Sequence, residues 1–306
     1  MELNSFIFPA PKPTYTYEAH KDDIIFIPRA KIVNGLSAHS VAAKFGKDSH
    51  HIPCWYIKYD EGSSKVLLYF HGNAEDAGVA KELLEEIGDY LKAHVVCVEY
   101  PGYGIYAGSP EASRIAQDAI NAYDFIAFEC GWGEENVIVM GRSIGTGPAI
   151  QVAAVKRPCA LLLLSPFTSI KGIIQSVSTK FLKLFVKERF NNTEIIKKVK
   201  CPTLIVHGKA DKLIPHTHSE ELAKNCGYTN CVLKMPLRMS HNEFELRNDV
   251  LVPFKDFIDK TGISTEVTAT TKSLITFPAS IHFIPANFPK PMKPSAIWRF
   301  LRNLLQ

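Results

Sequence analysis

Residues 135–150 read ENVIVMGRSIGTGPAI, in which one apolar run passes through the pentapeptide GRSIG into a second apolar run. The pentapeptide has the G-x-S-x-G pattern of a nucleophile elbow, where a strand turns sharply into a helix. The turn strains the serine backbone, and a Cβ at Gly141 or Gly145 would clash there. We expect Ser143 to lie at the carboxyl end of a buried strand and at a helix N-terminus, which favours developing negative charge. The G-x-G-x-x-G spacing of a phosphate-binding turn is not met.

Short apolar runs on either side of this stretch alternate with longer amphipathic ones. They predict eight strands, at residues 24–28, 54–59, 65–70, 94–100, 136–140, 160–165, 202–207 and 231–235. Several of these runs are apolar throughout, which is typical of parallel strands buried on both faces. The first two strands are expected to pair in antiparallel fashion at one edge of the sheet.

The amphipathic segments between the strands predict helices at residues 79–92, 110–130, 144–155, 219–226 and 248–260. Ser109 and Pro110 suit the N-cap and the first position of the second of these helices. The alternation of strands and helices indicates the α/β class, with a mostly parallel central sheet and helices on both faces.

The chain of 306 residues is expected to form one domain and a tail. Residues 1–262 form the catalytic domain, and we interpret residues 167–200 as a short helical cap, because this segment is too long for a simple crossover. Residues 263–306 form a proline-rich, irregular C-terminal tail that ends in an amphipathic stretch at 295–306.

The composition excludes several classes of protein. The net charge is only +4, and no concentrated basic patch stands out, so we expect no nucleic-acid partner. The seven cysteines are odd in number and include no C-x-x-C pair, which argues against a disulfide framework and a metal site. We expect no metal and no cofactor.

The N-terminus has no basic region followed by an apolar region, so it does not resemble a signal peptide. No apolar run approaches the ~18 residues that a membrane-spanning helix needs. We therefore expect a cytoplasmic protein. Two alternatives stay open for residues 295–306, which combine Trp, Leu and Arg: peripheral contact with a membrane, or docking on the domain.

A nucleophilic serine needs a histidine base and an acid that orients the base. After a nucleophile elbow the chain order is serine, acid, histidine. Asp211 follows the seventh predicted strand in a turn, and His241 lies in the loop before the last predicted helix. We predict Ser143, Asp211 and His241 as the catalytic triad. The alternative role for Asp211 is stabilisation of its turn.

Two backbone N–H groups should form an oxyanion hole. One belongs to Ile144, directly after the nucleophile, and the other to Asn73, or alternatively Ala74, in the loop HGNAED. His71 opens that loop, and we expect it to hold the loop rather than to act as the base. The aromatic residues of EYPGYG, at 99–104, are expected to line the site, although a plain turn explains this segment equally well.

Three further histidines follow the nucleophile. His207 ends a strand and is expected to pack or to cap. His216 and His218 open a helix, and we expect both side chains to face solvent.

The segments HGNAED, EYPGYG, GRSIGTGPA, LLLLSPFTS, PTLIVHGKADKLIP and SHNE occur in this order between residues 71 and 243. Together they resemble the α/β-hydrolase fold, and over residues 24–260 they are similar to the alpha/beta hydrolase domain-containing protein 17 group. The resemblance implies Ser143 as nucleophile, Asp211 as acid and His241 as base. Two features differ from the group: the first cysteine is Cys54, and Ser240 stands where relatives have glycine.

We therefore expect a serine hydrolase that cleaves an acyl ester or thioester through an acyl-enzyme. The resemblance implies that palmitoyl groups are removed from protein cysteines, so the expected partner is an acylated protein or a lipid ester. The alternatives are a carboxylesterase or lysophospholipase that acts on small lipid esters, and a non-catalytic binding protein of the same fold.

Overall fold

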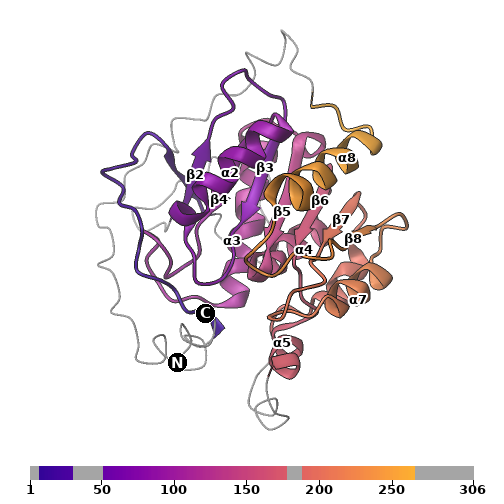
Figure 1. Cartoon of the computed structure of the whole chain (residues 1–306). Helices are drawn as coiled ribbons and strands as arrows, with labels where there is room; N and C mark the ends of the chain where they lie inside the picture. The colour runs from indigo at the N-terminus through magenta and orange to yellow at the C-terminus, as the bar shows by residue number, and fades with distance from the viewer. Residues whose placement is uncertain (1–6, 30–50, 178–187, 266–306) are drawn as a thin grey trace.

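A computed structural model describes residues 7–29, 51–177 and 188–265, which surround one central sheet (Figure 1). The spatial order of its strands is β1-β2-β4-β3-β5-β6-β7-β8. In chain order they are β1 (Ile24–Pro28), β2 (His51–Ile57), β3 (Val66–Phe70), β4 (His94–Val98), β5 (Val137–Arg142), β6 (Ala160–Leu164), β7 (Thr203–Val206) and β8 (Val232–Lys234). Each lies where an apolar run predicts a strand.

The sheet is mostly parallel. Every neighbouring pair from β4 through β3 and on to β8 runs parallel, whereas β2 is antiparallel to both β1 and β4. The predicted antiparallel pairing of the first two strands is therefore confirmed. Because the parallel strands point the same way, the loops that follow β3, β5, β7 and β8 leave the sheet at one edge, where the site lies.

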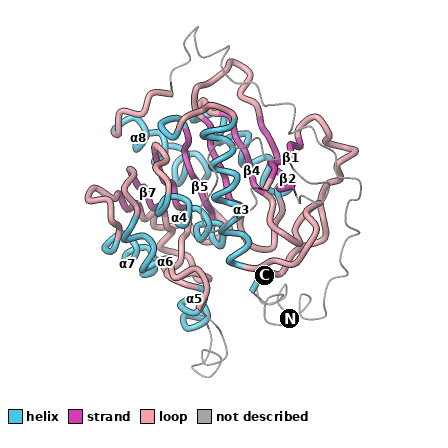
Figure 2. The backbone as a smooth tube through the Cα atoms, turned by 180° about the vertical axis from the view of Figure 1, so that it is seen from behind, coloured by secondary structure: helices cyan, strands magenta, loops and turns pink. Residues whose placement is uncertain are grey.

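Seven α-helices are described: α2 (Ala77–Leu91), α3 (Ala112–Asp124), α4 (Thr146–Val155), α5 (Ile170–Val177), α6 (Asn192–Ile195), α7 (Thr217–Asn225) and α8 (Val252–Lys260). Figure 1 shows α2 and α8 in front of the sheet, and Figure 2, from behind, shows α3 and α4 over the other face. The α/β class with helices on both faces is thus confirmed.

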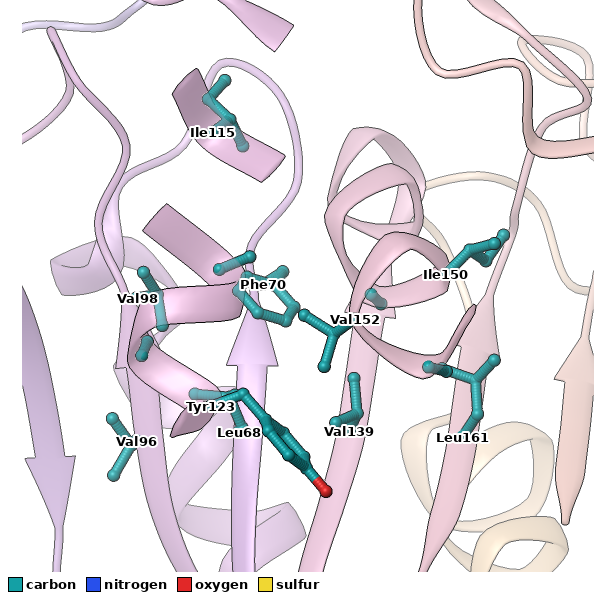
Figure 3. Close-up of a cluster of buried hydrophobic side chains, with 14 of the residues drawn as sticks. Leu68, Phe70, Val96, Val98, Ile115, Tyr123, Val139, Ile150, Val152 and Leu161 are labelled. Carbon is teal, nitrogen blue, oxygen red and sulfur yellow. The ribbon is translucent and has the colours of Figure 1, made fainter. Parts of the chain in front are cut away.

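The two covered faces explain why the central strands are apolar at every position. Leu68 and Val139 point toward α3 and α4, where they pack with Tyr123 and Val152 (Figure 3). The alternate position Leu67 lies in a second buried cluster, which contains residues of α2 and α8. Successive side chains of a strand point to opposite faces, so a strand buried on both sides needs apolar residues throughout.

The start of α3 differs from the prediction. This helix begins at Ala112, and Glu111 rather than Ser109 is its N-cap. Pro110 instead lies against Gly102, whose N–H donates to the Tyr106 carbonyl in the preceding loop. The loop therefore uses Pro110, and the helix starts two residues later. A π-turn over Phe125–Glu129 then continues α3 almost to the predicted end.

The described residues include parts of the predicted cap and tail. Helices α5 and α6 lie inside residues 167–200, while the role of this segment as a cap stays a prediction. Most of the predicted tail, including the amphipathic stretch at 295–306, falls outside the described residues. Within the described ranges, no helix has the length and apolar character to cross a membrane.

Candidate active site

The turn after β5 has the strained geometry of a nucleophile elbow. Ser143 has a backbone φ of +52°, in the left-handed region, and the 3₁₀ turn Ser143–Gly145 leads directly into α4. A Cβ on Gly145 would overlap the Phe70 and His71 carbonyls, and a Cβ on Gly141 would overlap the Gly145 carbonyl. Both glycines are therefore required by close backbone contact, as the sequence pattern predicts.

The structure brings the three predicted triad residues together from three different loops. Ser143 Oγ lies 3.0 Å from His241 Nε2, and His241 Nδ1 lies 2.7 Å from Asp211 Oδ2. An ionised carboxylate only accepts hydrogen bonds, so Nδ1 donates to Asp211 and Nε2 accepts from the Ser143 hydroxyl. This tautomer leaves Nε2 able to take the serine proton.

Asp211 is held as an anion. Its Oδ1 accepts from the backbone N–H groups of Leu213 (2.9 Å) and Ile214 (2.8 Å), and His207 Nε2 lies 3.2 Å from Oδ2. Burial alone would raise the pKa of Asp211, but hydrogen bonds from His207 and His241 hold this pKa well below its usual range. Asp211 thus stabilises its own turn with one oxygen and faces His241 with the other, so its position suits both predicted roles.

The loop after β3 packs directly against the elbow. The Asn73 side chain is tied at both ends: Nδ2 donates to the Ile7 carbonyl at 2.8 Å, and Oδ1 accepts from the Tyr103 hydroxyl at 2.8 Å. Ile144 lies in the first turn of the helical segment, where backbone N–H groups have no acceptor within the helix. The two predicted N–H donors therefore belong to segments that meet at Gly145.

His71 holds this loop through buried hydrogen bonds, as predicted. Its Nδ1 donates to the Gly72 carbonyl at 2.9 Å, and its Nε2 lies 2.9 Å from Glu99 Oε1. Burial alone would lower the pKa of His71, but the hydrogen bond and the charge of Glu99 outweigh it and raise the pKa. Glu99 also accepts from Tyr15 Oη and from the Ala77 N–H.

A family described as "Serine hydrolase (FSH1)" matches residues 137–237, which run from β5 to just past β8. The alpha/beta hydrolase domain-containing protein 17B of Homo sapiens is 30% identical over 216 residues, which cover 68% of this chain and 71% of that protein. The chain belongs to the alpha/beta hydrolase domain-containing protein 17 family. The alpha/beta hydrolase domain-containing protein aho-3 of Caenorhabditis elegans is 28% identical over 271 residues, or 87% of this chain and 80% of that protein.

The fold agrees with this family. An esterase from Pyrococcus furiosus, Pf2001, superposes with a TM-score of 0.61 over 83% of this chain and 98% of that chain, at 15% sequence identity. At that identity the likeness shows the fold alone. The chain is accordingly a serine hydrolase with the α/β-hydrolase fold.

The aromatic residues of the segment EYPGYG do not line the site of this family member. Tyr100 donates to the His71 carbonyl at 2.8 Å, and Tyr103 donates to Asn73. Both rings are buried, with 2% and 0% of their surface exposed. They support the loop after β3 from inside, so the expectation that they line the site is wrong.

The remaining histidines differ in whether they lie where the sequence predicts. His207 packs, as expected: it is fully buried, and its Nε2–H is shared between the Ile214 carbonyl at 2.8 Å and Asp211 Oδ2 at 3.2 Å. His218 does not face solvent, because it is buried and its Nδ1 lies 2.8 Å from the Thr168 hydroxyl. α7 packs inward at this position, which the local sequence does not reveal. His216 is half-buried.

Ser240 closes a turn that contains His241. Its Oγ accepts from the Glu243 N–H at 3.0 Å, and its own N–H donates to the Glu243 carbonyl at 2.9 Å. Its backbone does not adopt a left-handed conformation, so no glycine is required. A serine at position 240 is thus compatible with the observed position of His241.

Sequence reasoning missed Arg142, the residue between Gly141 and the nucleophile. Its Nη1 donates to Glu75 Oε2 at 3.2 Å, and its Nη2 donates to Asn242 Oδ1 at 2.9 Å and to the His241 carbonyl at 3.3 Å. These partners lie 67 to 100 residues away along the chain. The only signal in the sequence is a charged residue at the end of an otherwise apolar strand.

Proposed function

We propose that this chain is an acyl-protein thioesterase that removes long-chain acyl groups, palmitate above all, from protein cysteines. The observation that carries the proposal is the hydrogen-bonded series Ser143–His241–Asp211, with separations of 3.0 and 2.7 Å. This series supplies a nucleophile, a base and an orienting anion in the arrangement that acyl transfer requires.

In the first half of the reaction, Ser143 Oγ attacks the thioester carbonyl while His241 Nε2 takes the hydroxyl proton. Asp211 stabilises the imidazolium that results. The carbonyl oxygen becomes an oxyanion, and the backbone N–H groups of Ile144 and Asn73 are its proposed donors. The C–S bond then breaks, His241 returns the proton to sulfur, and the free cysteine thiol leaves an acyl group on Ser143.

In the second half, a water molecule replaces the thiol. His241 Nε2 takes a proton from the water, and the resulting hydroxide attacks the acyl carbonyl. Collapse of this second tetrahedral intermediate breaks the ester bond, and His241 protonates Ser143 Oγ. The products are a fatty acid and the regenerated enzyme, so no cofactor enters the balance.

A cluster of aromatic side chains packs against the helix that follows the elbow. Phe190 packs edge-on against Phe8 and Phe167, with ring centroids 6.5 and 6.4 Å apart. The Phe190 ring also lies against Gly147 in the first turn of α4, the helix that follows Ser143. All three rings are buried, so the cluster supports the start of α4. The preference for a long acyl chain follows from the family resemblance.

Labelling and turnover measurements test the proposal. A fluorophosphonate probe should label the wild-type protein and not Ser143→Ala. Ser165→Ala is a matched control, because Ser165 also ends a parallel strand, is buried and has a left-handed backbone (φ +50°). In a panel of acyl thioesters from acetyl to palmitoyl, turnover should rise with chain length and disappear in Ser143→Ala.

The alternatives give different results in the same panel. A carboxylesterase or lysophospholipase would hydrolyse short-chain esters or monoacyl lipids faster than palmitoyl-cysteine peptides. A binding protein without catalysis would show no labelling and no turnover. Full activity in Ser143→Ala would refute the nucleophile assignment itself.

A further inference from the structure

Arg142 connects the loops that flank the nucleophile. It occupies the middle of the segment Gly141–Ser143, and its side chain is 13% exposed. One terminal nitrogen, Nη1, lies 3.3 and 3.2 Å from the two carboxylate oxygens of Glu75, in the loop after β3. The other, Nη2, donates to the His241 carbonyl and to Asn242.

We propose that Arg142 is a positioning residue that holds the histidine loop and the oxyanion loop in register with Ser143. The proposal rests on the function proposed above for the triad. Arg142 does not contact the reacting atoms. It acts through the backbone of His241 on one side and through Glu75 on the other.

The contacts of Glu75 extend this connection to the oxyanion loop. Glu75 Oε1 accepts from the backbone N–H of Gly72, the residue that precedes Asn73. A continuous series of hydrogen bonds therefore runs from the Gly72 N–H through Glu75 and Arg142 to the His241 carbonyl. One end of the series, Gly72, directly precedes Asn73, and the other end is His241 itself. Both Asn73 and His241 have proposed roles in catalysis.

The anchoring of His241 explains why the backbone contact matters. Its ring is held by Asp211 at Nδ1, and its loop is closed by the turn between Ser240 and Glu243. Neither interaction fixes the peptide group of His241 relative to the nucleophile strand. Arg142 does so, because the same residue continues β5 and precedes Ser143.

The shape of the side chain is as important as its charge. Arginine carries its donors in a rigid planar fork, so it can reach two partners on opposite sides, whereas lysine offers one compact ammonium group. The charge itself is balanced locally by the Glu75 carboxylate. A variant that keeps the charge without the fork therefore separates geometry from electrostatics.

The main experiment compares Arg142→Gln and Arg142→Lys with wild type by steady-state kinetics on a palmitoyl thioester and by the rate of fluorophosphonate labelling. Misplacement of a catalytic group by about 1 Å lowers rates by about 100-fold. We expect kcat and the labelling rate to fall about 10- to 100-fold in Arg142→Gln, with KM nearly unchanged. Arg142→Lys should lose most of the same activity.

Arg114→Gln is the matched control. Arg114 makes a comparable pair with a buried carboxylate, since its Nε lies 3.2 Å from Asp118 Oδ2, but it lies on α3 away from the triad. Its loss should lower thermal stability by an amount similar to that of Arg142→Gln and leave kcat at the wild-type level. Equal falls in kcat for the two variants would overturn the positioning role.

Glu75→Gln tests the connection between the loops. If Glu75 and Arg142 act as one unit, the double variant with Arg142→Gln should be no slower than Arg142→Gln alone. If the fold-decrease in kcat of the double variant equals the product of the two single fold-decreases, Glu75 and Arg142 act independently and the proposed connection is refuted. If Arg142→Gln does not fold, Asn242→Ala, which removes only the 2.9 Å contact, should lower kcat several-fold, and wild-type kcat in that variant would overturn the proposal.

Failure of this inference can be distinguished from failure of the proposed function. If the true substrate is a small ester, Arg142→Gln should still hydrolyse that ester more slowly than wild type and be labelled more slowly by the probe. In that case the positioning role stands. If wild type and Arg142→Gln hydrolyse and label equally fast, the triad assignment stands and the positioning role is refuted. If Ser143→Ala retains full activity, both proposals fail.

Discussion

His71 Nε2 lies 2.9 Å from Glu99 Oε1, and neither side chain is exposed to solvent. The other ring nitrogen of His71 faces the Gly72 carbonyl. A carboxylate and a carbonyl only accept hydrogen bonds, so the ring satisfies both contacts only when both nitrogens carry a proton. A buried imidazolium–carboxylate pair therefore supports the loop that carries Asn73.

This pair predicts a loss of stability in alkaline solution. The pKa of His71 is raised in the folded protein above its ordinary value of about 6.5, so its contribution is complete below that pH. The contribution disappears as the pH rises through the raised pKa, by at most about 1.4 kcal/mol per pH unit. Urea unfolding of wild type and His71→Gln between pH 6 and pH 9 should show the difference in unfolding free energy shrinking as the pH rises.

A second histidine variant controls for this effect. His216 is half-buried and faces Glu220 at 3.9 Å on the surface. His216→Gln removes a histidine from this surface pair, so comparison with His71→Gln shows which effects belong to the buried pair. A constant difference between wild type and His71→Gln over the whole range would show that the pair is not an imidazolium–carboxylate pair.

Gly145→Ala should abolish the folded elbow. The backbone φ of Gly145 is −64°, so conformational strain is not the obstacle. The added Cβ would overlap the carbonyls of Phe70, the last residue of β3, and of His71, which follows it, and this backbone is held by the sheet. We expect a loss of more than about 3 kcal/mol in unfolding free energy, at the upper end for overpacking, together with loss of labelling at Ser143.

Gly131→Ala provides the comparison for this variant. Gly131 has a left-handed backbone (φ +76°), but a Cβ there would meet no atom within 4 Å. Its cost should be only the ~1–2 kcal/mol of an unfavourable backbone conformation. Thermal denaturation of both variants would contradict the clash argument if Gly145→Ala proved the more stable of the two.

Asp211→Asn should lower kcat by about 10⁴-fold if Asp211 orients the base, as the same substitution does in a serine protease triad. The asparagine amide can donate to His241 Nδ1, which would place the ring proton on Nε2 and prevent it from accepting the serine proton. Steady-state kinetics measures the effect. Asp118→Asn, which removes another buried and ion-paired carboxylate, should keep most of the wild-type kcat.

The same residue predicts how stability changes in acid. The pKa of Asp211 is lowered in the folded protein, chiefly by hydrogen bonds that outweigh burial, so its contribution is present above the ordinary value of about 3.9. The contribution is lost as the pH falls from there toward the lowered pKa. The difference in unfolding free energy between wild type and Asp211→Asn should therefore narrow below about pH 4, and a difference that widens there would refute the lowered pKa.

Much of the site follows from short local patterns. The elbow is predictable because Gly141, Ser143 and Gly145 are neighbours in sequence and their requirements are steric. The positions of Asp211 and His241 follow from the rule that loops after parallel strands meet at one edge of the sheet. The start of α3 could not be predicted in the same way, because Pro110 packs against Gly102 within the loop that precedes the helix, and neither periodicity nor capping preference reveals that contact.

The residues that hold the loops together could not be predicted from the sequence. Glu99 contacts His71 across 28 residues, and Arg142 contacts Asn242 across 100. A side chain that bridges distant segments leaves no periodic or local pattern, since its partners depend on how the loops are folded against each other. The inward-facing position of His218 is unpredictable for the same reason.

The chain alone therefore establishes the α/β class, the order of strands and helices, and the elbow that holds Ser143, because apolar periodicity and steric limits act between near neighbours. Folding establishes which charged groups are buried as pairs and which loops they connect. Buried charges are retained only where a partner compensates for lost hydration, and that partner is found in space rather than along the chain.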